Sequence, residues 1–498
     1  MQTITLSIVN ELAALPVLQA AAVAYCQALG TGLTFARQTE LVLEEIITNI
    51  IKFEYLAGHR EQIELALACE NGQLVLTISF RGIPFDVTFL QQCEQVCLDQ
   101  IVSGESRGIG LHLVRQFSDQ VRYCNLGKQG QQITILRTLP LTGTGDLQQA
   151  ATVQETEPAS VIGKPLIRRM LPQEAAAVSK LAYFAYDYSY VYEHIYYPEQ
   201  VRRLNAEECL ISFVAIDSAQ DEVVGHCALV PDQRSGLFEL GVAFVNPLFR
   251  GGGCLNELSE ALITEARQRA AAGVFVMAVT GHPYSQKAAG RYGLQETALL
   301  VSRFHPVTML ALHEQAVARE SVLFMVRLFD PSVPRTYSAP AHHRAMLQKI
   351  CEQSALQVSW APAGEPVLPQ EARLSTACDH YQSGHIHLEQ FGQDFLLQLK
   401  RIVRSWCLDR LESIYLYLPL QEPATALMTG PCEELGFFFA GIQPGGCGND
   451  QLLLQYLNNQ RIDYTALAGA TPFGRELIAY VGSCDPDRVG TAAAAVHG

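Results

Sequence analysis

The sequence lacks most of the features that would place a chain outside ordinary globular proteins. Its 35 Lys and Arg residues are outnumbered by 50 Asp and Glu, which gives a net charge of −15 and leaves no long basic run. Nucleic acid and anionic membranes are therefore not expected as partners. No stretch approaches the roughly 18 uninterrupted apolar residues of a transmembrane helix, and the first residues lack the basic and apolar regions of a signal peptide.

The sequence also lacks any Cys-x-x-Cys pair, although it contains 14 cysteines. Such pairs are typical of redox and zinc sites, and disulfides are typical of secreted chains. We therefore expect reduced, mostly buried thiols, no zinc site and a cytoplasmic location.

Two breaks in composition divide the chain into three parts. Residues 141–164 are rich in Thr, Gly and Gln and have little apolar periodicity, which is typical of a linker. Residues 330–335 contain two prolines, which stop regular structure. We therefore expect domains at 1–140, 165–330 and 335–498.

The expected elements define the fold class. In the first domain, helices at 10–29 and 37–54 accompany hairpins at 62–80 and 120–138, which predicts an α+β sandwich. The two later domains alternate strands and helices and are expected to be α/β. The last domain partly echoes the end of the middle domain, which indicates a weak internal repeat.

The most informative motif is Ser106–Arg115, in which Gly108 and Gly110 run into an apolar helical pattern. Backbone amides and a helix N-terminus would then face one spot, an arrangement that suits a polyphosphate. Upstream, Glu45 and Asn49 lie one helical turn apart on one face, and they could position a water and hold Mg²⁺. A solvated helix face is the alternative interpretation of that pair.

With the segment Phe80–Asp86 between them, these motifs resemble the GHKL ATP-binding fold, closest to the anti-sigma-factor serine kinases and their regulatory relatives. The resemblance covers most of residues 5–140 and implies ATP and Mg²⁺ as ligands. It implies that Glu45 acts as base or water-positioner and that Asn49 binds Mg²⁺. The other nucleotide contacts that it implies are Gly82, Arg107, Gly108, Gly110 and Leu111.

One position departs from that family. An aspartate that accepts a hydrogen bond from the adenine amino group is replaced here by Phe80. Loss of such a contact weakens both affinity and base selectivity. The sequence therefore leaves three alternatives: weak ATP binding, a different nucleotide, or a retired pocket.

A second glycine loop, Arg250–Gly253, follows the strand-like Phe238–Val245 and opens a helix. Its amides could surround a phosphate, and an ordinary glycine turn is the alternative. Segment 165–305 resembles the GNAT acyl-CoA-dependent N-acyltransferases, in which the strand before the loop splays at a bulge. The resemblance implies acetyl-CoA as cofactor, held by Val242, Phe244, Val245, Arg250, Gly251, Gly252, Gly253, Cys254, Leu255 and Ser285.

The chemistry of this family needs a base for the acceptor amine and often an acid for the departing thiolate. Glu239, the sole carboxylate on the splayed strand, is the predicted base. Many members of this family have a tyrosine that acts as the general acid, and Ala289 occupies that position here. Tyr292, with Tyr284 and Ser285, is therefore predicted to act as the acid instead.

Residues 335–498 contain no comparable site. His385 and His387 could face one side of a strand, but without a third ligand two surface histidines are the favoured interpretation. If the repeat is real, this part is a degenerate GNAT-like half that lacks the glycine loop.

We therefore expect a GNAT-like acyltransferase fused to an ATP-binding regulatory domain. It would act on a small-molecule or protein amine, and the first domain would also take a protein partner. One alternative is a signalling regulator with anti-sigma-type serine kinase or partner-binding activity, in which acyl-CoA is only sensed. Another is a scaffold with two vestigial sites.

Overall fold

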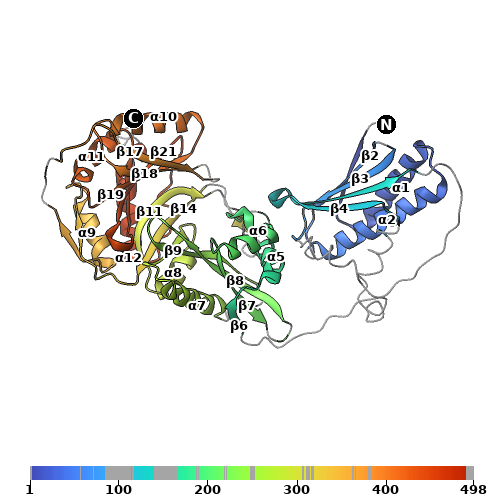
Figure 1. Ribbon diagram of the computed structural model, residues 1–498, viewed down its shortest axis with the longest axis horizontal. Helices are drawn as coiled ribbons and strands as arrows, with labels where there is room; N and C mark the ends of the chain where they lie inside the picture. Colours follow the sequence, from blue (N-terminus) through green and yellow to red (C-terminus); the bar gives the residue numbers. More distant parts are fainter. Residues whose placement is uncertain are drawn as a thin grey trace. The chain divides into compact units, whose positions relative to one another are not determined.

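The computed structural model of the chain divides into two compact units (Figure 1). Unit 1 comprises Met1–Gly163, Leu171–Tyr188 and Tyr192–Arg203, and unit 2 comprises Lys164–Met170, Ser189–Val191 and Leu204–Gly498. The structure describes residues 3–55, 58–70, 72–84, 114, 117–139, 165–186, 188, 190–217, 219, 221–246, 249, 253–304, 308–309, 314–315, 319–361, 364, 366–379 and 383–488. Within these ranges, no helix combines the length and the apolar composition that crossing a bilayer requires.

Unit 1 is built on a five-stranded antiparallel sheet with two long helices, α1 (Leu15–Ala28) and α2 (Leu33–Phe53). The strands, in spatial order, are β1 (Ile4–Val9), β2 (Gln62–Glu70), β3 (Gln73–Phe80), β5 (Gln131–Thr138) and β4 (Gln120–Asn125). Every second side chain of β3 is buried, and this apolar face joins α1 and α2 in one hydrophobic core (Figure 1). The α+β sandwich predicted for this region is confirmed.

The first helix of unit 1 begins later than the sequence pattern predicted. A 3-10 turn, η1 (Leu12–Ala14), precedes α1, and a proline occupies the first turn of the helix. Because proline lacks an amide hydrogen, it is favoured where that hydrogen would have no helical partner. The proline therefore explains why regular helix starts at Leu15 rather than near residue 10.

Short helical elements complete unit 1. They are η4 (Gly127–Gln129), η5 (Pro172–Glu174), α5 (Ala175–Tyr186), η6 (Glu193–Tyr196) and α6 (Pro198–Ala206). The sequence placed η5, α5, η6 and α6 in the middle domain, whereas the structure groups them, up to Arg203 of α6, with the first sheet. The Asn125 side chain donates a 2.8 Å hydrogen bond to the Tyr196 carbonyl, which links β4 to η6. The predicted linker at 141–164 lies outside the described residues.

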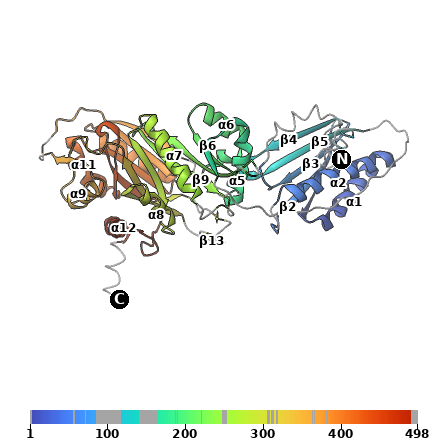
Figure 2. The same cartoon turned by 90° about the horizontal axis from the view of Figure 1, so that it is seen from below.

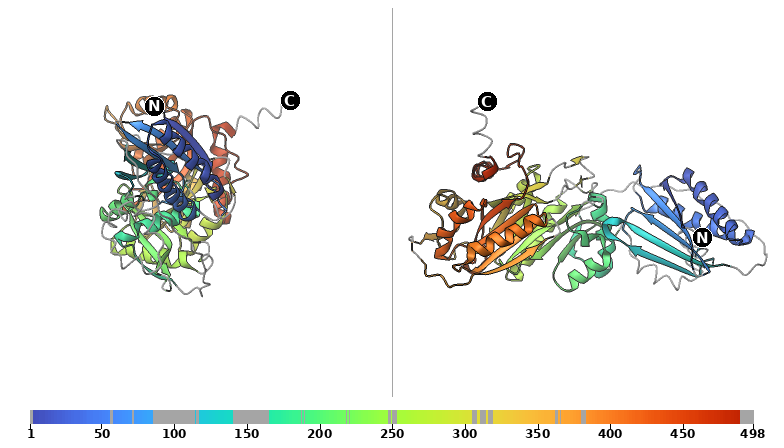
Figure 3. Two further views of the ribbon diagram at one scale, coloured as in Figure 1. Left: turned by 90° about the vertical axis from the view of Figure 1, so that its right-hand side faces the viewer. Right: turned by 90° about the horizontal axis from the view of Figure 1, so that it is seen from above.

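The main sheet of unit 2 has the strand order β17-β18-β19-β21-β20-β11-β14-β10-β9-β8-β7-β6 (Figures 1 and 3). The strands of its first half are β6 (Leu166–Arg169), β7 (Ile211–Asp217), β8 (Glu222–Pro231), β9 (Leu237–Val245), β10 (Gly273–Val279), β11 (Gln295–Phe304) and β14 (Glu320–Leu328). Those of its second half are β17 (Arg373–Cys378), β18 (Ser383–Gln390), β19 (Ser413–Pro419), β20 (Phe438–Gln443) and β21 (Gln451–Leu457). Two small ladders, β12 (Thr308–Met309) with β13 (Glu314–Gln315) and β15 (Arg335–Tyr337) with β16 (Val358–Trp360), are separate from this sheet.

Helices pack against the sheet of unit 2. They are α7 (Cys254–Gln268), α8 (Tyr284–Arg291), α9 (Arg344–Gln353), α10 (Phe395–Leu408), α11 (Pro423–Glu434) and α12 (Pro472–Cys484), with a 3-10 turn η8 (Gly446–Gly448). Figure 2 shows α7 lying along the strands of the first half, where it contacts β7, β8, β9 and β10. One continuous hydrophobic core includes α7, α9, α10, α11 and α12 together with both halves of the sheet.

The two halves repeat one arrangement, as the weak sequence repeat indicated. In each half a parallel strand pair, β9 with β10 or β18 with β19, is followed by a helix and two antiparallel strands. The halves meet where β11 pairs with β20, at Ala298 opposite Gly441. A Cβ at Gly441 would clash with the Thr297 carbonyl oxygen, so only glycine permits this approach.

The shared sheet joins two regions that the composition divided into separate domains. The prolines at 330–335 stop regular structure as expected, but strands on both sides of them belong to one sheet. The predicted boundary at 330 therefore does not separate two compact units. Sheet pairing between residues more than 100 positions apart leaves no local trace in composition.

Candidate functional site

The first half of unit 2 contains a wedge between two parallel strands. β9 pairs with β10 only from Leu237 to Glu239, opposite Gly273 to Phe275. Beyond Glu239, β9 stays paired with β8 while β10 stays paired with β14. Because the two strands follow different neighbours, their facing backbone edges separate. Such edges offer hydrogen-bonding groups to an extended ligand.

A buried histidine supports the irregular backbone on one side of the wedge. The register of β8 and β9 shifts between His226 and Ala228, and Val242 has a positive φ of 52°, which is strained for a β-branched residue. His226 Nδ1 lies 2.7 Å from the Val242 carbonyl oxygen, so the ring donates its Nδ1 hydrogen there. Burial lowers the pKa of His226 to about 4, against the weaker opposing effect of that hydrogen bond.

Aromatic stacking fixes this histidine. The Phe244 ring stacks on His226 with centroids 5.2 Å apart, and Tyr190 meets the edge of Phe244 at 5.1 Å. The sequence did not single out His226, because a lone histidine in an apolar strand carries no motif. Only its contact with the bulge carbonyl distinguishes it.

The predicted cofactor residues of β9 line this bulge. Val242, Phe244 and Val245 are 2%, 3% and 9% exposed, so their side chains pack in the core. A pantetheine arm would therefore meet their backbone rather than their side chains. Glu239 is half-buried and lies at the last paired position before the strands separate, which places it at the narrow end of the wedge.

Helix α7 begins beside the wedge with a glycine. Gly253, its N-cap residue, has a φ of 84°, and a Cβ at this position would meet no atom of the described residues within 4 Å. Among the described residues, nothing therefore covers this side of the glycine, as a phosphate site requires. Arg250, Gly251 and Gly252 lie outside the described residues, so their predicted role stays a prediction.

The two residues after Gly253 differ in exposure. Leu255 is 37% exposed, whereas Cys254 is 3% exposed and lies against Gly225 of β8. Burial, with a smaller effect of Glu257, raises the pKa of the Cys254 thiol to about 11. Cys254 therefore packs the helix against the sheet as a neutral thiol, so its side chain is not available to contact a cofactor as the resemblance implied.

The turn from β10 to α8 brings further polar groups together. The Ser285 hydroxyl and His282 Nδ1 are buried and have no hydrogen-bond partner among the described residues. Burial raises the pKa of the Glu320 carboxyl, against the opposing effect of nearby His282. Ser285 was predicted from sequence, but His282 and Glu320 were missed. The Gly-His-Pro triplet after a strand was the available signal for His282, and Glu320 had none.

Tyr292, the predicted acid, ends α8 with its hydroxyl near α7. Burial raises its pKa, and its neighbours include Ser259 and Glu260 of α7. Tyr284, by contrast, is 67% exposed, and its ring lies 5.1 Å from that of His282. Ala289 is 5% exposed and packs in the core, which explains why a small residue occupies that position.

The second half of unit 2 supports the β10–α8 turn. The Gln286 side chain, 1% exposed, donates to the Val279 and Ala468 carbonyls at 3.0 and 2.7 Å and accepts from the Ala470 amide at 2.7 Å. The Ala468 amide in turn donates to the Thr280 carbonyl. A segment almost 190 residues away thus holds the turn that carries Ser285.

In unit 1, the predicted Mg²⁺ pair lies on one face of α2. Glu45 and Asn49 are both half-exposed, as the spacing of four predicted. Burial, followed by the charge of Glu44, raises the pKa of the Glu45 carboxyl. An amide and a carboxylate oxygen on this face fit the ligand preferences of Mg²⁺.

Phe80 and Gly82 follow the end of the buried β3. Phe80 is 3% exposed and belongs to the hydrophobic core, so this position supplies no hydrogen-bond acceptor for a base. A Cβ at Gly82 would clash with the Glu54 carbonyl oxygen, which explains this glycine by packing alone. Arg107, Gly108, Gly110 and Leu111 lie outside the described residues.

Tyrosines recur between positions 183 and 196, and three of them contact one another. Within unit 1, Tyr183, Tyr188 and Tyr196 pack together, with centroids 5.2 and 5.0 Å apart in succession. The Tyr188 hydroxyl donates to the Gly82 carbonyl, and the Arg81 guanidinium lies 5.4 Å from the Tyr188 ring. These three tyrosines are therefore buried packing residues, and Tyr188 also contacts Gly82 of the segment Phe80–Asp86.

The histidines of β18 are placed differently from the sequence expectation. His385 Nε2 lies 3.2 Å from Asp379 Oδ2, and its Nδ1 lies 2.9 Å from the Tyr417 hydroxyl. His387 stacks on Tyr417 with centroids 4.1 Å apart. They share one side of the strand as predicted, but both are only partly exposed rather than free on the surface. Ring contacts with Tyr417 cover part of each side chain.

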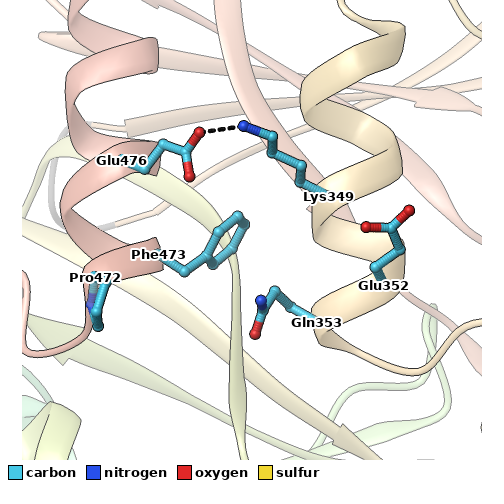
Figure 4. A pocket seen from close by; sticks show the side chains of 6 residues that line it. All are labelled: Lys349, Glu352, Gln353, Pro472, Phe473 and Glu476. Carbon is cyan, nitrogen blue, oxygen red and sulfur yellow. Dashed lines mark hydrogen bonds and ion pairs between the residues drawn. The ribbon is translucent and has the colours of Figure 1, made fainter.

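A pocket of about 330 Å³ lies between α9 and α12 (Figure 4). Its lining residues are Lys349, Glu352, Gln353, Pro472, Phe473 and Glu476. Lys349 pairs with Glu476 across it, and these side chains are 51% and 46% exposed. Such exposed ion pairs contribute little energy and indicate a surface feature rather than a reaction site.

Comparison with known proteins gives matches to separate parts of the chain. Residues 8–137 match the histidine kinase-like ATPase domain family, which confirms the GHKL-like prediction for this region. A search of curated proteins found no match. Solved structures similar to part of the chain include GNAT acetyltransferases, as the resemblance predicted.

Three of these structures illustrate the likeness. The ribosomal-protein-S5-alanine acetyltransferase from Vibrio fischeri is 10% identical, with 35% of this chain and 98% of that chain covered and a TM-score of 0.28. The ribosomal-protein-alanine N-acetyltransferase from Brucella melitensis is 20% identical, with coverages of 33% and 99% and a TM-score of 0.28. A GNAT family acetyltransferase from Brucella melitensis in complex with acetyl-CoA is 22% identical, with coverages of 34% and 89% and a TM-score of 0.23.

Proposed function

We propose that unit 2 is an acyl-CoA-dependent N-acyltransferase and that the sheet domain of unit 1 is its ATP-binding regulator. The observation that supports the first part is the wedge that opens beyond Glu239, next to the glycine N-cap of α7. A parallel pair that separates beside an open helix N-terminus suits a ligand with an extended arm and a pyrophosphate.

Each part of the wedge has a role in this proposal. The backbone of Val242 to Val245 holds the pantetheine arm, and the loop that ends at Gly253 holds the pyrophosphate. Acetyl-CoA supplies the acyl thioester. Glu239 accepts the proton of the acceptor amine, directly or through a water, because it lies where the wedge begins. Tyr292 is the proposed acid, and His282 is a second proton donor on the β10–α8 turn.

Calorimetric titration with acetyl-CoA tests the wedge. Gly253→Val fills open space at the helix N-terminus, so binding should fall below detection. Gly448→Val is the matched control, because Gly448 also has positive φ, 78°, and no atom within 4 Å of its Cβ position, but lies in the second half. Equal affinity in Gly253→Val and the parent would contradict the proposal.

A second candidate function is a signalling regulator that binds nucleotide and a protein partner and only senses acyl-CoA. The match of residues 8–137 to the ATPase domain family favours it. Its reaction is phosphoryl transfer to a serine, whereas the first candidate transfers an acyl group to an amine. Assaying both transfers with one preparation separates the two candidates.

Nucleotide binding in unit 1 is tested through Asn49. Asn49→Ala should remove the Mg²⁺ dependence of ATP binding, and the neighbouring Thr48→Ala should leave it intact. Phe80→Asp would return a hydrogen-bond acceptor to the position where the resembled family has an aspartate. Because Phe80 is 3% exposed in the core, that exchange would bury a carboxylate and destabilise unit 1 instead.

A further inference from the structure

A cluster of two histidines and a glutamate lies in the second half of unit 2, away from the wedge. His342 and His343 directly precede α9, and Glu433 lies in the last turn of α11. One ligand atom from each of the three side chains lies within 4.8 Å of the other two. The sequence did not reveal this site, because the histidines and the glutamate are about 90 positions apart.

Both rings present the same nitrogen to the carboxylate. His343 Nε2 lies 2.6 Å from Glu433 Oε1, and His342 Nε2 lies 2.9 Å from Glu433 Oε2. The ligands of a tetrahedral Zn²⁺ stand about 3.3 Å apart, given bonds of about 2.0–2.1 Å. Entry of an ion therefore requires each histidine nitrogen to move away from its carboxylate oxygen by less than about 1 Å.

The surroundings hold one ligand rigid and leave another free to adjust. His343 is 3% exposed, and its ring lies 4.6 Å from that of Phe439. The His342 side chain is 51% exposed, so it gives solvent and ions a way in. A water can then complete the coordination on the exposed side, as in zinc sites with three protein ligands.

Tyr480 of α12 provides the outer partner that metal-bound histidines usually have. Its hydroxyl lies 2.8 Å from His343 Nδ1 and 3.3 Å from the His342 carbonyl oxygen. When Nε2 binds a metal, Nδ1 carries the ring proton and donates it to Tyr480, whose own hydrogen goes to the carbonyl. This chain of donors fixes the ring in its ligating tautomer.

We propose that His342, His343 and Glu433 form a zinc site, completed by water, that ties the start of α9 to the end of α11. Two imidazoles and a carboxylate are the donor set that Zn²⁺ accepts, and the single carboxylate suits Zn²⁺ better than the all-oxygen preference of Mg²⁺ or Ca²⁺. The site braces the half of unit 2 that lacks a glycine loop.

Metal binding by the full-length protein tests the site. After removal of metals, Zn²⁺ should bind with one equivalent at the site, and Co²⁺ should give the absorption spectrum of a four-coordinate ion. Glu433→Gln and His342→Ala should each weaken binding more than about 10-fold. Glu434→Gln, which removes the same charge one residue away on an exposed position, should bind like the parent.

Thermal unfolding provides a second measurement. Zn²⁺ should raise the melting temperature of the parent and of Glu434→Gln, but not that of Glu433→Gln. His342→Ala keeps the test valid if Glu433→Gln folds poorly, because His342 is exposed. No binding by the parent, or equal binding by all four proteins, would overturn the proposal.

Discussion

In the first half of the unit 2 sheet, residues 246–253 separate β9 from α7, whereas in the second half only residues 391–394 separate β18 from α10. The parallel pairing also differs. It stops after three residue pairs between β9 and β10 but continues for five between β18 and β19. The second half therefore opens later along its strands and has a shorter connection to its helix.

The N-terminus of α10 is covered by the chain itself. The N-cap residue Asp394 accepts a 2.7 Å hydrogen bond from the Ala372 amide, and the Gln393 amide donates to the Pro369 carbonyl at 2.9 Å. A Cβ at Gly392 would clash with the Ala372 amide nitrogen. Where the first half has Gly253, the second half places a carboxylate and the packed segment 369–372, and both disfavour a phosphate.

The third pair of each parallel ladder shows the same contrast. Counted from the first pair, Glu239 opposite Phe275 corresponds to His385 opposite Tyr415. Glu239 lies where its strands separate, whereas His385 is bonded to Asp379 and Tyr417 within a continuous ladder. Topology alone therefore does not make a site: the connecting loop and the length of the ladder decide whether a ligand can enter.

The largest effect is expected where the halves join. Gly441→Ala should lower the free energy of unfolding by about 3–5 kcal/mol, because its Cβ would clash with the Thr297 carbonyl and its φ is unfavourable. Denaturant unfolding measures this. Gly430→Ala, within α11 with no atom near its Cβ position, should instead stabilise by up to about 1 kcal/mol. Equal stability of Gly441→Ala and the parent would mean that the halves do not depend on this contact.

The two halves should lose stability over different ranges of acid pH, because each contains a histidine whose pKa is lowered by burial. The pKa of His226 is lowered by burial from 6.5 to about 4. Between these pH values, the histidine is protonated in the unfolded chain but neutral in the folded chain. The contribution of His226 is complete above pH 6.5, and about 3 kcal/mol is lost as pH falls toward 4.

His226→Phe should remove this loss, which unfolding at a series of pH values measures. His387 provides the comparison in the second half, because burial lowers its pKa to about 3. His387→Phe should thus reduce acid sensitivity down to about pH 3. A pH profile unchanged in His226→Phe would show that this ring is charged or exposed in the folded state.

Substitution of Glu239 should lower the rate of catalysis, whereas substitution of His385, at the equivalent position of the second half, should not. Glu239→Gln retains size and loses proton acceptance, so turnover should fall about 100-fold with acetyl-CoA affinity nearly unchanged. His385→Gln, at the equivalent ladder position, should leave turnover at the parental level. Steady-state kinetics and calorimetry together measure both quantities. Full activity of Glu239→Gln would point to a water or substrate group as base.

The smallest effect is expected from removing the carboxylate at the N-terminus of α10. Asp394→Ala removes the carboxylate at the helix start, but the packed residues 369–372 remain. We therefore expect slightly lower thermal stability and no second acetyl-CoA equivalent in calorimetry. Two equivalents in this variant would show that a single carboxylate, rather than the covering segment 369–372, closes the second half.

Sequence patterns predicted the parts of the fold that depend on neighbouring residues. The alternation in β3 and the spacing of Glu45 and Asn49 each reflect the geometry of one element, and the structure confirms both. The sequence also predicted the strand at Phe238–Val245, the glycine before α7 and the partly repeated order of strands in 335–498. These signals are local because each depends on backbone geometry within one or two turns or strands.

The candidate sites were only partly predictable. Glu239 and Ser285 followed from their places around a motif, whereas His226, His282 and Glu320 lie in segments without one. Their significance comes from a bulge carbonyl, a buried turn and a neighbouring strand. The sequence also interpreted His385 as a surface residue, because a single strand does not show which neighbours will cover it.

By itself, the sequence determined the elements of this protein, the family resemblance of its first domain and the position of an open glycine before α7. Only the tertiary structure decided that residues on both sides of 330–335 share one sheet, that Pro369 and Ala372 cover the start of α10, and that Glu433 faces His342 and His343. The physical reason is distance along the chain. Backbone conformation is set within a few residues, whereas burial and ligand geometry arise between segments that meet only after folding.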